Sequence, residues 1–184
     1  MKTAHLLALP GLIGLLLLAA ALPTPAQQAT APGPETSSMM RIKRTTVLVH
    51  DLERSIAFYT QVMGLELFDV EYEYNTDPDS YGYPLFNIPQ GARKRMAIFN
   101  TSDEQRGFAI EEVLDFDWQV QQNPRTAVAL FETDDIRGLE QRLKAGGYTV
   151  WKPTPGEAYD TRFVEMGFLD PDGHLLAAFQ YFGD

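Results

Sequence analysis

Apolar residues recur along this chain with two different periods, and the order of the periods is repeated. In the first half, an apolar stretch containing Val47 and Val49 leads into residues 52–63, whose apolar side chains recur every three to four positions. This spacing predicts a strand followed by an amphipathic helix. Asp51 is a favourable N-cap for that helix, and Gly64 is a favourable residue at its end.

Three further strands are predicted after this first helix. Residues 68–74 place aromatic and aliphatic side chains on one face and acidic side chains on the other, which predicts a half-buried strand. Residues 95–100 and 108–114 are stretches of strand length and strand composition. The first half is therefore expected to form a strand, a helix and three more strands, in that order.

The second half repeats this order. A strand over residues 126–133 leads through Asp134 and Asp135 to a helix with Ile136, Leu139 and Leu143 on one face, which ends at Gly146–Gly147. The remaining strands are predicted over residues 148–152, 162–169 and 174–182, and a turn at residues 170–173 joins the last two. The chain is therefore predicted to have an α+β fold built from two βαβββ modules.

The N-terminal segment has the composition of a targeting sequence. Lys2 precedes an uncharged apolar run over residues 6–22, and residues 24–26 supply the small side chains of a cleavage site. This pattern predicts a signal peptide over residues 1–26 and export to the periplasm or the cell exterior. The alternative is an uncleaved helix that anchors the protein in the membrane. Residues 27–40 are rich in Ala, Pro, Ser and Gln, which predicts a disordered spacer.

The remaining residues, 41–184, are expected to form one domain, with module one over about residues 41–116 and module two over about residues 125–184. The formal net charge of −10 and the lack of a basic cluster argue against nucleic-acid binding. Because the sequence contains no cysteine, disulfides, thiolate metal ligands and cysteine nucleophiles are excluded. The expected partner is a small molecule, and no stable membrane span is expected once the signal peptide has been removed.

Two short segments resemble a known superfamily. Residues 49–59 (VHDLERSIAFY) are similar to the first strand-to-helix passage, and residues 170–176 (DPDGHLL) to the final hairpin, of the glyoxalase, bleomycin-resistance and extradiol-dioxygenase proteins. These proteins share the vicinal oxygen chelate fold. The resemblance implies two curved sheets paired around a cleft, in which His, Glu or Gln residues from four strand positions hold a divalent metal. Members often pair their modules across subunits, so a homodimer is also an expectation.

The four positions that the resemblance assigns to metal ligands are largely altered in this chain. They fall on Arg44, Glu111, Val128 and Ala177, with Glu111 preferred over its neighbour Glu112. A guanidinium stays protonated and cannot coordinate a metal, and neither valine nor alanine has a donor atom in its side chain. No bound metal and no other cofactor are therefore expected. Arg44 and Glu111 are expected to form an ion pair, or else to reach solvent at the rim of the cleft.

Strand alternation places mostly apolar side chains in this cleft. The predicted binding residues are Arg44, Thr46, Leu48, Glu111, Val128, Leu130, Glu132, Leu175, Ala177 and Phe179. An apolar cleft without a metal favours non-covalent binding of a small organic molecule. The alternative is a glyoxalase-like lyase or isomerase, or a dioxygenase, that uses Glu111 or Glu132 as a base. The sequence identifies no catalytic residue.

Two other features have open interpretations. His50 and His174 lie at predicted turns, where structural roles are favoured over catalytic ones. Residues 75–90 are longer than an ordinary hairpin connection and contain Tyr81, Tyr83 and Phe86. This segment is expected either to cover the cleft as a lid or to pack as an ordinary surface loop.

Overall fold

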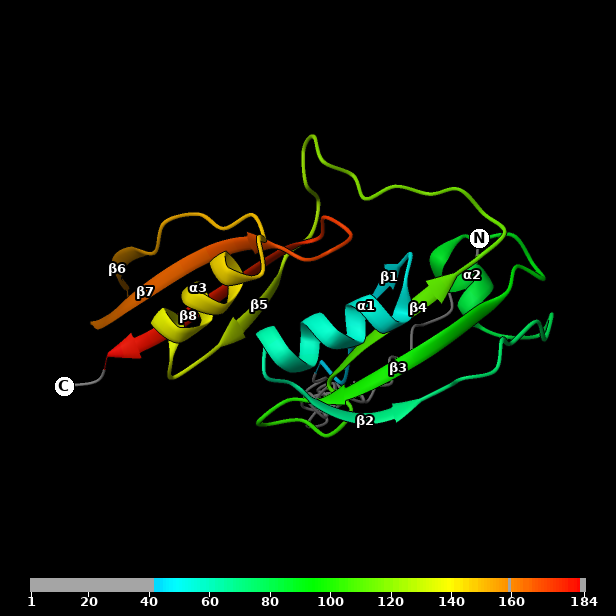
Figure 1. Ribbon diagram of the computed structural model, residues 1–184, viewed down its shortest axis with the longest axis horizontal. Coiled ribbons are helices and arrows are strands. Elements are labelled where there is room, and N and C mark those ends of the chain that lie inside the picture. Colours follow the sequence, from blue (N-terminus) through cyan, green and yellow to red (C-terminus); the bar gives the residue numbers. More distant parts are fainter. Residues whose placement is uncertain (1–41, 159, 183–184) are drawn as a thin grey trace, which may run out of the picture. The chain divides into compact units, whose positions relative to one another are not determined.

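Each half of the chain forms a four-stranded sheet with helices attached (Figure 1). The computed structural model describes residues 42–158 and 160–182. The first half contains β1 (Thr45–Val49), α1 (Leu52–Ala57), the π-helical turn η1 (Phe58–Val62), β2 (Glu66–Val70), α2 (Gly82–Phe86), β3 (Lys94–Asn100) and β4 (Phe108–Val113). The second half contains β5 (Ala129–Glu132), α3 (Ile136–Ala145), β6 (Thr154–Ala158), β7 (Thr161–Leu169) and β8 (Leu175–Phe182).

The two sheets have equivalent topologies. The strand order is β1-β4-β3-β2 in the first sheet and β5-β8-β7-β6 in the second. In each sheet the first and last strands of the module pair in parallel, and the other neighbours are antiparallel. The predicted α+β fold with two βαβββ modules is therefore confirmed, with α2 as an addition to the first module. The predicted signal peptide and spacer lie outside the described residues.

The two main helices begin where their capping residues predict. The Asp51 carboxylate accepts a hydrogen bond of 2.9 Å from the Arg54 N–H, and the Asp135 carboxylate accepts one of 2.9 Å from the Gly138 N–H. The first helix is not a continuous α-helix, because its last turn is π-helical and the Met63 N–H donates to the Phe58 carbonyl at 3.1 Å.

Three strands differ from their predicted ranges. β2 ends at Val70 and is largely exposed, because it is an edge strand whose register with β3 shifts between Leu67 and Asp69. The strand predicted over residues 148–152 is reduced to one bridge from Val150, and β6 lies further along the chain. β6 contains Pro155, which an edge strand tolerates because its N–H is not needed for pairing. β5 is shorter than predicted and begins at Ala129.

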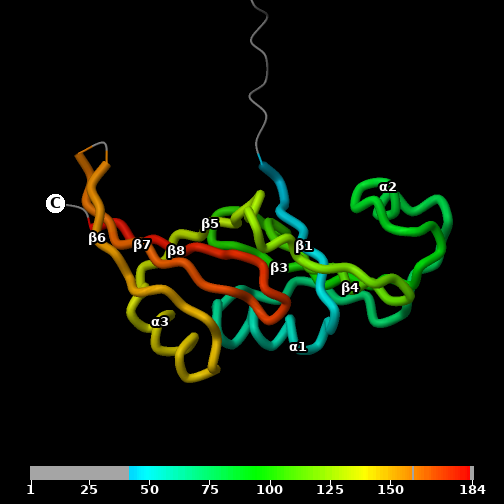
Figure 2. The backbone as a smooth tube through the Cα atoms, turned by 90° about the horizontal axis from the view of Figure 1, so that it is seen from above, coloured from blue at the N-terminus to red at the C-terminus, as the bar shows by residue number. Residues whose placement is uncertain are grey.

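The helices α1 and α3 lie on the same side of the two sheets, and α2 lies on the opposite side of the first sheet (Figure 2). Residues from both modules form one buried core on the side of α1 and α3, with contributions from Val49, Phe108, Leu139 and Leu176. Alternate residues of each strand point to the opposite side, which we call the open face. Among the residues that the structure describes, no helix combines the length and apolar character needed to cross a bilayer.

Candidate functional site

The open face of the first sheet is covered by the segment that contains α2. Tyr83, Ile88 and Ala92 of this segment are buried together with Val113 of β4, and Leu48 of β1 packs against them. The Tyr83 hydroxyl donates a hydrogen bond of 2.9 Å to the Ala92 carbonyl, and this bond holds α2 against the end of the same segment. Residues 75–90 were expected to form either a lid or a packed surface loop. Tyr83 is only 3% exposed, as expected for a packed loop.

Beneath this cover, Glu111 has a partner that the sequence did not predict. Its carboxylate lies 3.0 Å from the ammonium group of Lys94, and both side chains are almost fully buried. Arg44 instead donates from Nε to the Arg106 carbonyl at 3.1 Å. The predicted Arg44–Glu111 ion pair was therefore wrong: each residue has another partner. Gly82 lies directly above the Lys94–Glu111 pair, because a Cβ added there would be 3.1 Å from each of the two charged atoms.

The open face of the second sheet contains a cavity of about 480 Å³. This volume lies within the usual range for small-molecule sites, roughly 300–1,000 Å³. Two of its residues, Leu130 and Phe179, are among the predicted binding residues. Five others were not predicted: Ala158, Thr161, Phe163, Glu165 and Tyr181.

Three aromatic rings and one carboxylate give this cavity its chemistry. The Phe179 and Tyr181 rings pack edge to face with their centroids 4.7 Å apart, and Phe163 meets Tyr181 at 6.4 Å. Glu165 of β7 is in register with Phe179 of β8, so the carboxylate and the ring are neighbours on the same face. The cavity therefore combines aromatic surface with one negative charge.

The other predicted binding residues are divided among several places. Thr46, Val128 and Leu175 line a smaller cavity of about 240 Å³ between β1 and the second module. Glu132 is in register with Phe179, and Ala177 is in register with Leu130, so both lie beside the larger cavity on the open face. Leu48 packs under the α2 segment, as Glu111 does. The predicted residues therefore do not form one continuous site in this chain.

The residues at the four positions that the resemblance assigns to metal ligands do not fit a divalent metal. The Glu111 carboxylate is compensated by the Lys94 ammonium in a buried pair, and a cation of the protein thus already lies where a metal would be needed. Val128 and Ala177 present no donor atoms, whereas a catalytic centre typically needs three protein ligands. No chemical step through a metal is therefore assigned to these positions.

Elsewhere, the carboxylates of Asp51, Glu53 and Glu112 lie within 4.8 Å of one another. They are already engaged: the Arg95 guanidinium bridges Glu53 at 2.9 Å and Glu112 at 2.6 Å. Burial favours the protonated form of Glu112, but hydrogen bonds from Arg95 and from the Leu52 N–H outweigh burial and hold the pKa of Glu112 below its ordinary value. We interpret this cluster as support for the start of α1.

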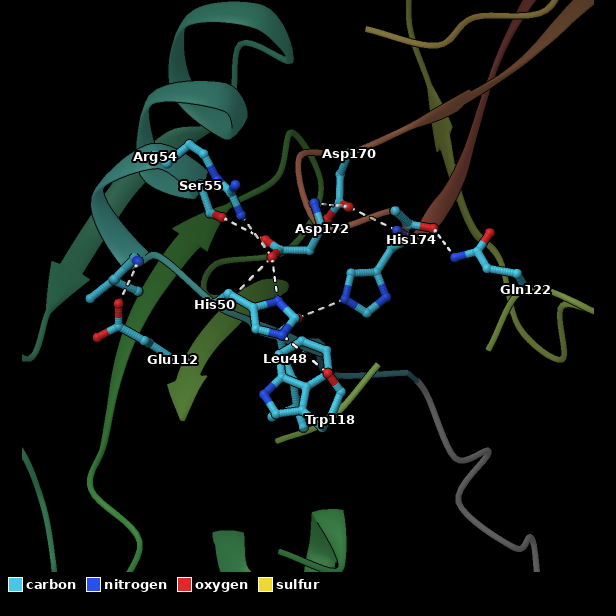
Figure 3. A network of polar contacts seen from close by, with 12 residues as sticks. Leu48, His50, Arg54, Ser55, Glu112, Trp118, Gln122, Asp170, Asp172 and His174 are labelled. Carbon is cyan, nitrogen blue, oxygen red and sulfur yellow. Dashed lines mark hydrogen bonds and ion pairs between the residues drawn. The ribbon is translucent and has the colours of Figure 1, made fainter. Parts of the chain in front are cut away.

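The two segments that carry the family resemblance meet at the junction between the modules (Figure 3). The Asp172 side chain is 1% exposed, and its Oδ1 accepts hydrogen bonds from the His50 ring at 2.7 Å and from Arg54 at 2.7 Å. The His50 backbone N–H donates to Oδ1 at 3.1 Å, and the Ser55 hydroxyl donates to Oδ2 at 3.2 Å. The Asp172 carboxylate, from the turn between β7 and β8, thus binds donors at the N-terminal end of α1.

Neighbouring groups extend this junction. Tyr59 of the first module donates a hydrogen bond of 2.7 Å to Asp170, and burial together with the Asp170 carboxylate raises the pKa of Tyr59 well above its ordinary value. The His174 ring lies 2.6 Å from the Leu48 carbonyl, and the His50 ring stacks on Trp118 at 3.9 Å. Both histidines thus have structural partners, in line with their predicted roles.

Comparisons with known proteins agree with this architecture. The profile of the Glyoxalase/Bleomycin resistance protein/Dioxygenase superfamily matches residues 41–178. A protein of Vibrio cholerae named "Probable lactoylglutathione lyase" is 33% identical over 147 residues, which are 76% of this chain and 90% of that protein. "Glutathione transferase FosA" of Serratia marcescens is 26% identical over 138 residues, 75% of this chain and 79% of its own.

Among solved structures, a glyoxalase family protein from Bacillus cereus superposes with a TM-score of 0.64 at 14% sequence identity, and covers 82% of this chain and 100% of its own. At this identity the likeness concerns the fold alone. The matched profile, the related sequences and the two βαβββ modules together show that this chain belongs to the Glyoxalase/Bleomycin resistance protein/Dioxygenase superfamily, that is, to the vicinal oxygen chelate proteins.

Proposed function

We propose that this protein binds a small organic molecule non-covalently in the cavity of its second sheet. The observation that carries the proposal is the contrast between the two open faces. The first is filled by the α2 segment and by a buried ion pair, whereas the second contains a cavity of about 480 Å³ lined by Leu130, Phe163, Phe179 and Tyr181. Aromatic side chains offer large contact areas for a flat ligand.

Acridine, a flat neutral heteroaromatic in mildly alkaline buffer, is a suitable probe for this cavity. We expect it to bind saturably in isothermal titration calorimetry. Replacing Leu130 by tryptophan should weaken this binding by about tenfold or more, because the indole would occupy the cavity. Leu130 is 55% exposed, so the fold should be retained, as the thermal unfolding midpoint can verify. An unchanged affinity in the Leu130→Trp variant would place the ligand elsewhere.

A lyase or isomerase reaction is the competing proposal, and the name of the Vibrio cholerae relative favours it. A glyoxalase assay on purified protein, with nickel, zinc, iron or manganese added in turn, distinguishes the two. We expect no metal-dependent turnover, because Arg44, Val128 and Ala177 stand at three of the four positions that the family resemblance assigns to metal ligands. Turnover that needs one of these metals would overturn the binding proposal.

Export and self-association belong to the same proposal. The support for export is the apolar run over residues 6–22 and the small residues that follow it. The support for a homodimer is the exposed apolar surface of the second module outside the cavity lining, where Val128, Trp151 and Phe182 are each about half exposed. Fractionation of the producing cells and light scattering on the purified protein test the two parts. A protein retained in the membrane fraction, or a monomer at high concentration, would contradict the corresponding part.

A further inference from the structure

We propose that the ligand of the second-sheet cavity is a planar organic cation, such as an aromatic ammonium compound. This inference rests on the proposed binding function and specifies its ligand. It comes from a row of three residues across the open face, in which Phe179 of β8 is in register with Glu132 of β5 on one side and with Glu165 of β7 on the other.

The register determines where these side chains point. Residues that face each other across neighbouring strands project from the same side of a sheet and are roughly 5 Å apart. The Phe179 ring is therefore flanked by two carboxylates, and Glu165 itself lines the cavity. The adjacent row contains Tyr181 and Phe163, whose rings meet edge to face. A flat ligand on this surface would contact aromatic faces and carboxylates at the same time.

Charge makes the site selective. Within the described part of the chain, the residues that line the cavity include no basic side chain, and Glu165 is exposed without a hydrogen-bond or ion-pair partner. The nearby Arg125 guanidinium lies over the Trp151 ring at 5.7 Å and is not part of the lining. An anion would meet an uncompensated carboxylate here, whereas a cation gains both from the carboxylates and from the negative faces of the rings.

Further aromatic rings border this surface. Gly167 of β7, next to the Glu165–Phe179 row, is covered by the Trp151 ring, because a Cβ added to Gly167 would lie 3.1 Å from that ring. Gly156 of β6 lies under the Phe163 ring, because a Cβ added to Gly156 would come within 2.5 Å of that ring. The aromatic ring therefore leans over the neighbouring strand. The Trp151 and Phe163 rings thus extend the aromatic surface beside the Glu165–Phe179 row.

The test compares two ligands of nearly the same shape. N-methylacridinium carries a permanent positive charge, and acridine is neutral in mildly alkaline buffer. Titration calorimetry of the full chain at low salt should show about tenfold tighter binding of N-methylacridinium. Acridine-9-carboxylate, which is anionic, should bind more weakly than acridine. The advantage of the cation should shrink as salt is added, since exposed charges are screened.

Charge-removing variants localise the effect. Glu165→Gln should reduce the tenfold preference for the cation to about threefold, and the Glu132→Gln, Glu165→Gln double variant should nearly abolish it. Acridine is measured on the same variants as the neutral reference, and the ratio of the two affinities is the quantity that is compared. Glu73→Gln is the matched control, because Glu73 is an exposed glutamate of the first module and should leave the preference unchanged.

The outcomes separate this inference from the proposed function. If acridine binds and N-methylacridinium binds no more tightly, or if the preference survives in the double variant, the cation proposal is wrong and the binding proposal stands. If neither compound binds, while the variants unfold like the original protein, the binding proposal itself has failed. A preference for acridine-9-carboxylate would also overturn the cation proposal.

Discussion

Replacement of Asp172 by alanine should lower the free energy of unfolding by about 2–3 kcal/mol, because it removes a buried carboxylate that accepts hydrogen bonds from charged and neutral donors. The side chain is 1% exposed and accepts four hydrogen bonds from His50, Arg54 and Ser55. Without the carboxylate, the donors at the start of α1 lose their shared acceptor while they remain packed at the junction. Equilibrium unfolding in urea measures the change.

Two further variants establish that the effect belongs to the junction. Asp172→Asn keeps one oxygen acceptor but removes the charge, so its loss of stability should be smaller than that of Asp172→Ala. Asp103→Ala removes a carboxylate from an exposed position and should change stability by no more than about 0.5 kcal/mol. If Asp172→Ala were no more destabilising than Asp103→Ala, the Asp172 carboxylate would contribute nothing measurable to the stability of the junction.

The two motifs that, together with the repeated βαβββ pattern, indicated the superfamily meet at this junction. Asp51 and Asp172 belong to the two motifs that resemble the superfamily, and the structure brings those motifs into contact. Asp51 acts locally as a helix cap, which is visible in the sequence because a cap depends on neighbours along the chain. The role of Asp172 depends on partners about 120 positions away, so its spacing indicates a turn but not what the turn binds.

The strands that were misplaced show the limits of a periodic pattern. The alternation over residues 68–74 predicts a buried face, yet β2 is an edge strand with no further strand beyond it in the described sheet. β6 carries Pro155 and Gly156, which indicate a turn, although the segment pairs with β7 at the edge of the second sheet. In both cases tertiary position overrides the local preference.

The candidate site was predictable only in part. Alternation correctly indicated that Leu130 and Phe179 face the side away from the helices. The same alternation over residues 162–169 places Glu165 on that side as well, whereas the family resemblance points to Ala177, which is buried. The first open face is covered and the second contains a cavity because the α2 segment packs on the first sheet. This packing is a tertiary contact, which a local sequence pattern does not predict.

Lys94 was missed because the predicted strand began one residue later, at Arg95. Strand β3 includes Lys94, and its pairing with β4 puts Met96 opposite Glu111, so Lys94 is the diagonal neighbour of Glu111 on the same face. Once the register is known, the ion pair is the expected compensation for a buried carboxylate. In the first module the buried Glu111 carboxylate is thus neutralised by a cation of the same sheet.

Replacement of Lys94 by methionine should therefore lower the free energy of unfolding by about 3–5 kcal/mol, because it leaves the Glu111 carboxylate buried without a cation. The double variant Lys94→Met, Glu111→Leu should recover most or all of this loss, since apolar side chains of similar volume can replace a buried pair at little cost. Urea unfolding of the two single variants and the double variant gives the coupling between the residues.

Lys144→Met is the matched control, because Lys144 pairs with Glu140 at the surface and such pairs contribute at most about 1 kcal/mol. Divalent zinc or nickel should not restore the stability of Lys94→Met, since Val128 and Ala177 offer no further ligands. Restoration by either metal would show that Glu111 can belong to a metal site, and the interpretation that these positions do not fit a divalent metal would be wrong. Equal stability of Lys94→Met and Lys144→Met would likewise contradict a compensated buried charge at Glu111.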